Sequence, residues 1–413
     1  MPGKSTRTVA ELQIGRRSRP ARLLLLFGGI IVGLLIAEGA LRIAGFTYFN
    51  PSIVDQDLGY ALRPGAEGWW KREGLTYVKI NSHGFHDREH TIAKPPDTFR
   101  IAVLGDSFVE AFQVPLDKAF SSVMERKLQG CPPAGRSKVE VLSFGVSGFS
   151  TARELILLQK RVWQYSPDVI VLLFTTGNDV RDNSQTLNEY ENHALPYFVF
   201  QNGRLVLDDS LVAARNRTLT FRLQQSSFGK AFNWLQNHVR LLGLIYTIRE
   251  SYQSSSQVPE RMKHLSTQSE TGLDSEVYDR PASPEWDDAW RVTEGLLVEM
   301  RDEVRAKGAK FLVVTGSMGI QVNPDSNVRQ GFMNRLGIRS LFYPDERIKA
   351  LGEREGFEVL TLAPALADYA SRNQVFLHGV GDTKGRGHWN ESGHQVAGEL
   401  IAAELCKGTS YEK

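Results

Sequence analysis

The chain has 413 residues, of which 41% are hydrophobic and 23% are charged, and its formal net charge is +2. This length allows one large domain with additions or two domains, and the charge gives no indication of binding to nucleic acid or to an acidic polymer. The two cysteines, Cys131 and Cys406, lack the spacing of metal ligands, so we predict neither a metal site nor another cofactor.

The amino terminus carries a basic segment followed by an apolar one. At about 1.5 Å per residue, a helix over residues 23–46 would be roughly 36 Å long, which is enough to cross a bilayer. Because basic flanks stay in the cytoplasm, we predict a cytoplasmic basic tail over 1–22, a transmembrane signal anchor over 23–46 and the bulk of the chain outside. A cleaved signal peptide is the alternative, since Ala37 and Gly39 have small-x-small spacing.

Residues 47–99 predict a short β-rich lead-in, with two strand-like runs around Gly74. From Arg100 onward, strand-like and helical patterns alternate. The strand-like runs are 101–105, 139–145, 168–174, 310–316 and 357–362. Continuous apolar strands separated by helices indicate an α/β fold with a parallel sheet covered on both faces.

Residues 185–285 interrupt this alternation and form an insertion. Its first part predicts a hairpin with Asn202 and Gly203 at the turn, and residues 228–252 predict one amphipathic helix. Residues 251–283 are polar and predict a loop. An insertion at the carboxyl edge of the strands commonly forms a lid or a substrate wall, and the alternative is an inert surface subdomain.

Four residues with complementary chemistry lie where the pattern predicts strand ends or a helix start. Ser107 follows the first strand in Gly-Asp-Ser, Gly148 follows the second, Asn178 follows the third, and His388 precedes the last helix. In an open α/β sheet these segments meet at one edge. Acyl transfer needs a nucleophile, a base and donors for the oxyanion, so we assign Ser107 as nucleophile and His388 as base. The backbone N–H groups of Ser107 and Gly148 and the side-chain amide of Asn178 are the candidate oxyanion donors.

The order of these blocks resembles the GDSL lipase/esterase family, also called SGNH hydrolases. The matching blocks are Gly105 to Phe108, Gly148 in "GVSGFS", Asn178 in "TGND" and His388 in "GHWNESGH". The resemblance covers about residues 98–406. It implies a flavodoxin-like three-layer α/β/α sandwich, built from residues 100–184 and 286–413.

One position departs from the family pattern. The family usually has an aspartate two or three residues before the histidine, where this chain has Arg386 and Gly385. Asp382, six residues before His388, is the nearest substitute as third catalytic residue. A backbone carbonyl orienting the imidazole of His388 in a Ser107–His388 dyad is the alternative, and we favour it because of the unusual spacing.

The lead-in also looks like that of membrane-anchored bacterial members, which implies a periplasmic domain held at the inner membrane. The resemblance implies a serine-dependent esterase that forms an acyl-enzyme on acyl or acetyl esters of an envelope glycan or lipid. Two alternatives remain open: an O-acyltransferase acting with envelope polysaccharide machinery, and a non-catalytic scaffold that binds glycan.

A flavodoxin-like order and an oxidising compartment together predict a disulfide. The helix that precedes Cys131 and the last helix, which ends at Cys406, would lie side by side on one face of the sheet, so we predict that these cysteines are bonded. Three further polar residues near the site, Asp106, Asp179 and His394, are interpreted as structural.

Overall fold

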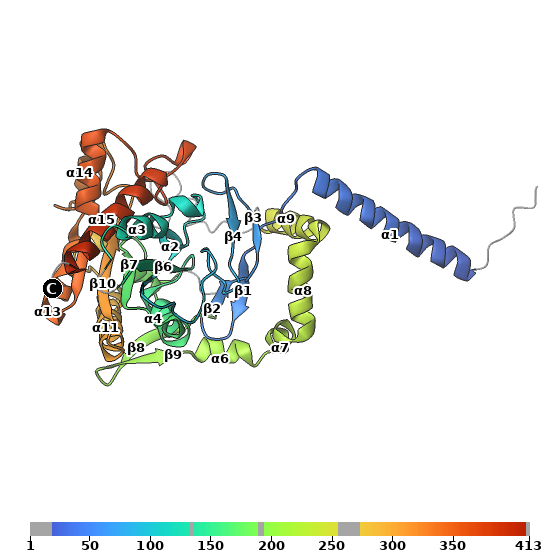
Figure 1. The fold of residues 1–413 in the computed structure, drawn as a ribbon, viewed down its shortest axis with the longest axis horizontal. Coiled ribbons are helices and arrows are strands. Elements are labelled where there is room, and N and C mark those ends of the chain that lie inside the picture. The colour runs from blue at the N-terminus through green and yellow to red at the C-terminus, as the bar shows by residue number, and fades with distance from the viewer. Residues whose placement is uncertain (1–18, 133–135, 189–193, 255–272, 410–413) are drawn as a thin grey trace, which may run out of the picture.

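The computed structural model describes residues 19–132, 136–188, 194–254 and 273–409. At its centre lies a five-stranded sheet in the order β11-β10-β7-β5-β6, with every neighbouring pair parallel (Figure 1). The strands are β5 (Thr98–Gly105), β6 (Lys138–Gly145), β7 (Val169–Thr175), β10 (Lys310–Gly316) and β11 (Glu358–Thr361). Numbered along the chain, this order is 2-1-3-4-5, the flavodoxin-like arrangement. The predicted α/β fold with a parallel sheet is therefore confirmed.

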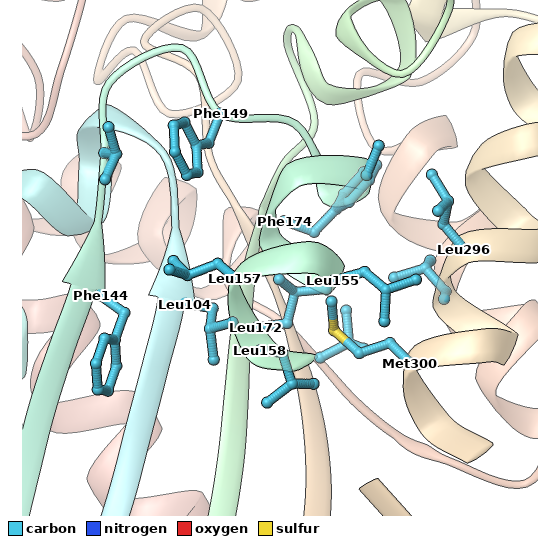
Figure 2. Close-up of a cluster of buried hydrophobic side chains, with 14 of the residues drawn as sticks. Leu104, Phe144, Phe149, Leu155, Leu157, Leu158, Leu172, Phe174, Leu296 and Met300 are labelled. Carbon is cyan, nitrogen blue, oxygen red and sulfur yellow. The ribbon is translucent and has the colours of Figure 1, made fainter. Parts of the chain in front are cut away.

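Helices cover both faces of the sheet because the strand side chains alternate between two apolar clusters. Leu104 and Leu172 point to one cluster, whereas Val103 and Val171 point to the other. The first face is covered by α4 (Thr151–Lys160), α11 (Pro284–Ala306) and α13 (Tyr343–Glu355), and Figure 2 shows part of this cluster. The second face is covered by α3 (Phe120–Leu128), α14 (Ala363–Asn373) and α15 (Glu391–Thr409). Between β10 and α13 lies α12 (Ser326–Leu336), none of whose side chains is fully buried.

Helices α3 and α15 are joined covalently. Cys131, just beyond α3, is disulfide-bonded to Cys406 in α15, with a distance of 5.8 Å between the two Cα atoms. An ion pair of 2.7 Å between Lys127 and Glu399 joins the same helices. The predicted disulfide is confirmed, and it links segments 275 residues apart.

The lead-in forms two antiparallel hairpins, of which the sequence predicts only the two strand-like runs around Gly74. One pairs β1 (Ser52–Asp55) with β2 (Gly59–Leu62), and the other pairs β3 (Glu67–Trp70) with β4 (Thr76–Lys79). Their buried side chains, including Leu58, Val78 and Ile80, belong to the apolar cluster on the first face of the sheet. The lead-in is therefore packed onto the α/β domain, which lets it contribute to a site there.

The insertion begins with the predicted hairpin, β8 (Tyr197–Gln201) and β9 (Arg204–Asp208), whose turn residues Asn202 and Gly203 both have positive φ. Up to residue 254, four helices follow: α6 (Ser210–Asn216), α7 (Leu219–Gln225), α8 (Ser227–His238) and α9 (Arg240–Ser254). The prediction of one helix over 228–252 is wrong, because Val239 is extended and separates α8 from α9. The predicted polar loop over 251–283 includes residues 255–272, which lie outside the described residues.

The amino-terminal helix α1 (Arg19–Ile43) projects away from the α/β domain (Figure 1). Its segment Arg22–Ile43 is long and apolar enough to cross a membrane, and none of it is buried in the protein. A signal sequence would have the same properties. Near the end of α1, Glu38 and Arg42 form an ion pair of 2.8 Å one turn apart.

Candidate active site

Ser107 lies at a sharp turn from strand to helix. β5 ends at Gly105, and Ser107 is the first residue of α2 (Ser107–Glu110). A Cβ at Gly105 would lie 2.3 Å from Cγ2 of Val109, and one at Gly145 would lie 2.2 Å from the backbone nitrogen of Glu110. Glycine at both strand ends therefore lets α2 fold back over the edge of the sheet. This places the Ser107 hydroxyl at the carboxyl edge, as the sequence predicts.

His388 reaches Ser107 from the loop between α14 and α15. Its Nε2 lies 2.8 Å from Oγ of Ser107, although the two residues are 281 positions apart. The ring of Phe108 packs against the imidazole, with 5.1 Å between the ring centroids. The imidazole is thus placed to accept the proton of the serine hydroxyl.

The two chain neighbours of His388 are held by a chain of hydrogen bonds. Nδ1 of His378 lies 2.7 Å from the carbonyl oxygen of Gly387, and its Nε2 lies 3.0 Å from Oγ of Ser317. Oγ of Ser317 accepts a bond of 2.9 Å from Nε1 of Trp389. Burial lowers the pKa of His378 to about 4 and keeps the ring neutral, so Nδ1–H donates to Gly387 and Nε2 accepts from Ser317. Both residues that flank His388 are fixed in this way.

The other nitrogen of His388 is held by an acid from the lead-in. Nδ1 lies 2.5 Å from Oε2 of Glu73, which sits in the turn between β3 and β4. The hairpin is anchored beside the site, because Oγ1 of Thr76 donates to the carbonyl oxygen of Gln113 at 3.1 Å. Gly387 has a φ of +75°, and a Cβ there would lie 2.6 Å from Oε1 of Glu73. Glycine before His388 therefore permits the close approach of the carboxylate.

Electrostatics support an ionised glutamate beside the imidazole. Burial alone would raise the pKa of Glu73, but its hydrogen bonds with His388 and the charge of that ring outweigh burial and lower the pKa. Burial alone would lower the pKa of His388, but the hydrogen bond and charge of Glu73 outweigh burial and raise the pKa. The pair thus favours a carboxylate that stabilises an imidazolium, which is the function of the third residue in a serine hydrolase triad.

The expectation for Asp382 is wrong. This residue lies in the exposed turn Gly381–Thr383, where its backbone carbonyl accepts a bond of 3.4 Å from Arg386. The alternative, a backbone carbonyl on Nδ1 of His388, is also wrong, because Glu73 occupies that position. The missing aspartate at Gly385 and Arg386 was the only sequence signal that the acid comes from elsewhere. A glutamate in a hairpin turn is too common to identify it.

The loop that carries Gly148 is held from two sides. The backbone N–H and the hydroxyl of Ser147 donate to the carboxylate of Glu110, at 2.5 and 2.8 Å. The carbonyl oxygen of Ser147 accepts a bond of 2.9 Å from the hydroxyl of Tyr60, in β2. Gly148 has a φ of +71°, and a Cβ there would lie 2.7 Å from that hydroxyl. Glycine is therefore needed both for the backbone conformation and for the approach of Tyr60.

Asn178 lies at the start of α5 (Asp179–Asp182), beyond the end of β7. Its Nδ2 donates to Asp182 at 3.1 Å and to Asp106 at 3.4 Å, and Asp106 directly precedes Ser107. The loops after β5, β6 and β7 thus meet at one edge, as the sequence predicts. The donor roles assigned to Gly148 and Asn178 stay predictions.

The three residues interpreted as structural make contacts that agree with that interpretation. Asp106 accepts the backbone N–H of Phe108 at 3.0 Å, and Asp179 accepts that of Thr175 at 2.7 Å. Nδ1 of the buried His394 accepts the backbone N–H of Phe120 at 3.2 Å. Among the described residues, no group of three or more His, Cys, Asp or Glu side chains could hold a metal ion.

Comparisons with known proteins give a likeness to solved structures only. No family model matches the chain, and no curated protein matches it. A structure of an acetyl xylan esterase is 12% identical, covers 74% of this chain and all of its own, and has a TM-score of 0.36. A lipase/acylhydrolase from Enterococcus faecalis is 14% identical, covers 75% of this chain and 96% of its own, and has a TM-score of 0.36. A putative G-D-S-L family lipolytic protein from Desulfitobacterium hafniense is 10% identical, covers 74% and 98%, and has a TM-score of 0.34. At these values the likeness adds nothing to what the strand order and the site geometry establish.

Proposed function

We propose that this chain is a serine-dependent ester hydrolase with a Ser107–His388–Glu73 triad. The observation that carries the proposal is the pair of contacts made by one imidazole, 2.8 Å to Oγ of Ser107 and 2.5 Å to the carboxylate of Glu73. A hydroxyl, a histidine and an acid in this order form the arrangement that activates a serine nucleophile on several unrelated folds. The roles are assigned by this geometry and not by sequence position.

In the proposed reaction, Oγ of Ser107 attacks the carbonyl carbon of an ester while Nε2 of His388 takes the hydroxyl proton. The negative oxygen that forms is bound by the N–H groups of Ser107 and Gly148 and by the amide of Asn178. The tetrahedral intermediate expels the alcohol, which receives the proton from His388, and the acyl group remains on Ser107. Water then attacks the acyl-enzyme by the reverse sequence and releases the carboxylic acid. Glu73 stabilises the imidazolium in both halves.

We further propose that α1 is retained as a single membrane anchor and that the catalytic domain lies in the periplasm of a bacterial cell. The basic segment before the apolar helix supports this orientation. The substrate would then be an acyl or acetyl ester carried by an envelope glycan or lipid. If a sugar hydroxyl replaced water in the second half-reaction, the same site would act as an O-acyltransferase within envelope polysaccharide machinery.

The test is turnover of p-nitrophenyl acetate by the full chain in detergent or nanodiscs. Ser107→Ala should abolish turnover, and His388→Ala should reduce kcat by about a thousandfold or more. The nucleophile and the base act as a unit, so the loss of either one removes most of the rate enhancement. Ser210→Ala, at the start of α6 in the insertion, is the control and should retain full activity. Turnover that persists in Ser107→Ala would contradict the proposal, as would a wild-type protein without activity on any ester.

A further inference from the structure

A cavity of about 910 Å³ is lined by residues of the lead-in, of the insertion helices and of the loop that carries Ser147 and Gly148. We call this loop the oxyanion loop. Ser147 and Gly148 are among the lining residues of the cavity, and so are residues of α8. Its cationic lining residues are Arg63, Arg153, Arg215 and Lys230. None of the lining residues that the structure describes is acidic, and the other polar ones among them carry amide or hydroxyl groups. The overall charge of +2 therefore conceals a local concentration of positive charge beside the candidate active site.

Arg153 is the most deeply buried of these four cations, and among the described residues it forms no ion pair. Its relative exposure is 2%, and its Nη1 is buried with no hydrogen-bond partner. The guanidinium lies over the rings of Tyr60 and Phe149, at 4.9 and 4.7 Å from their centroids. By contrast, Arg215 is committed to the fold, since it donates to the carbonyl oxygens of Gly59 and Asp55.

Within the described part of the chain, the acid next to this arginine in sequence does not offset its charge. The adjacent Glu154 is fully buried, and burial, reinforced by the charge of Asp106, raises its pKa well above the ordinary value and favours the neutral form. An arginine stays charged in a protein, and a buried charge is costly unless it is paired. The aromatic rings over the guanidinium offset part of that cost but supply no hydrogen-bond acceptor. The remaining donors of Arg153 are therefore suited to an anionic group that enters the cavity.

We propose that the cavity binds an acidic saccharide and that Arg153 receives its carboxylate or phosphate group next to the oxyanion loop. The amide and hydroxyl lining suits sugar hydroxyls, and guanidinium groups bind carboxylates and phosphates through paired hydrogen bonds. This inference rests on the proposed esterase function and narrows its substrate to an ester on a negatively charged sugar. The insertion then acts as a substrate wall.

The test compares matched esters that differ in one charge. The first pair is O-acetylated oligogalacturonide and its neutral methyl ester, which differ by a carboxylate. The second pair is O-acetylated glucose 6-phosphate and O-acetylated glucose, which differ by a phosphate. In each case kcat/KM for release of acetate is measured. We expect wild-type kcat/KM to favour one acidic member at least tenfold, and the preference to fall with added salt. Arg153→Gln should reduce that preference about tenfold or more, as expected for the loss of a charge-assisted hydrogen bond. Equal kcat/KM for both members of both pairs in the wild-type chain would overturn the inference, even if Arg153→Gln fails to fold.

Arg335→Gln is the matched control, because Arg335 also lies over an aromatic ring, that of Phe332, but is exposed and does not line the cavity. It should keep the wild-type preference. Calorimetric binding of deacetylated oligogalacturonide and of glucose 6-phosphate to Ser107→Ala separates this inference from the proposed function. Binding without turnover of any ester by the wild type would refute the esterase and retain the acidic-saccharide site. Turnover without a charge preference would refute the acidic-saccharide site and retain the esterase.

A second inference concerns the outer face of α8, which the cavity does not use. Phe228, Trp234 and Leu235 are 76%, 58% and 40% exposed, and together with Ala231 they lie along one side of the helix. Gly229, Asn233 and Gln236 lie on the other side and line the cavity. A helix with one side on the protein and an exposed apolar side that includes tryptophan has the composition of a membrane-surface helix.

The position of α1 indicates which surface covers this face. Glu38 accepts the backbone N–H groups of Arg240 and Leu241, at 3.1 and 2.9 Å, and so caps the start of α9. Arg42 donates to the carbonyl oxygen of His238, at the end of α8, at 2.7 Å. The carboxyl-terminal end of α1 is thus bound to the corner between α8 and α9. Figure 1 shows that α8 runs across the direction of α1. A bilayer spanned by α1 would lie alongside α8.

We propose that Phe228, Trp234 and Leu235 insert into the headgroup region of the bilayer that α1 crosses. The experiment uses the full chain in nanodiscs with a polarity-sensitive fluorophore on Trp234→Cys or Phe228→Cys; the two native cysteines are already bonded to each other. Both labels should shift to the blue and be quenched by lipids that carry a spin label near the headgroup. A label on Leu336→Cys, at the end of α12, is the control and should show neither effect. Unquenched labels at both α8 positions would overturn this inference.

Discussion

The edge of the parallel sheet and the hairpin of the lead-in contribute to the site in different ways. Ser107, Gly148 and Asn178 follow three adjacent strands, so the topology of the sheet alone brings their loops together. Glu73 lies outside that topology and reaches His388 only because the β3–β4 hairpin is packed on the domain. A parallel sheet thus determines where the proposed nucleophile and the proposed oxyanion loops lie, whereas the proposed acid of the triad comes from an appended segment.

The largest expected effect tests the contribution of the hairpin. Glu73→Gln should lower kcat by about 10³- to 10⁴-fold, because substitution of the orienting acid in a serine-protease triad costs about 10⁴. The fold should remain, since the amide is nearly isosteric. Asp382→Asn is the matched control and should leave kcat/KM within about twofold, because this exposed side chain does not hold His388. Equal losses in the two variants would contradict the assignment of Glu73.

The pH dependence of Glu73→Gln sharpens the same comparison. His388 accepts a proton only when neutral, and Glu73 raises its pKa above the ordinary 6.5, so wild-type kcat/KM should rise with pH through a midpoint above 6.5. Burial also raises the pKa of Glu110 to about 7, so a second group titrates in this range. In Glu73→Gln the His388 midpoint should move to lower pH, because the hydrogen bond and charge of Glu73 no longer oppose burial and only the charges of Asp106 and Glu110 still do. An acid limb that does not move would show that Glu73 leaves the imidazole unaffected.

A smaller loss is expected at the sheet edge itself. Asn178→Ala should lower kcat by about 100-fold or more, the usual loss for one oxyanion donor, with little change in KM. Asn373→Ala is the control, because its exposed amide donates to the carbonyl oxygen of Tyr369 within α14 and lies on a helix away from Ser107. Stopped-flow measurement of the acylation step would assign the loss to transition-state binding. A change in KM alone would place Asn178 in substrate binding instead.

What the sequence could predict follows the same division. The parallel sheet covered on both faces and the β8–β9 hairpin follow from apolar periodicity and turn residues. The strand order and the Cys131–Cys406 disulfide follow only from the flavodoxin-like arrangement that the family resemblance implies. The break at Val239 could not be predicted, because it depends on the carboxylate of Glu38, about 200 residues away, capping α9. Glu73 and Tyr60 were missed for the same reason. Each acts through one contact between distant segments, and such contacts leave no periodic signal in the chain.

The smallest effect tests whether the lead-in also supports the oxyanion loop. Tyr60→Phe removes the hydroxyl that binds the carbonyl oxygen of Ser147, while Glu110 keeps its two bonds to the same residue. A single hydrogen bond is worth about 0.5–1.5 kcal/mol, so kcat should fall about two- to tenfold. Because the phenyl ring still packs on Arg153, the preference for acidic esters should change less than kcat.

The rate of inactivation by a phosphonate, which also needs the oxyanion donors, should fall in parallel with kcat. Tyr77→Phe removes a hydroxyl from the solvent side of the same lead-in and should change none of these values. A drop in thermal stability without a drop in kcat would show that Tyr60 serves the fold alone, and the contribution of the lead-in to catalysis would then be limited to Glu73.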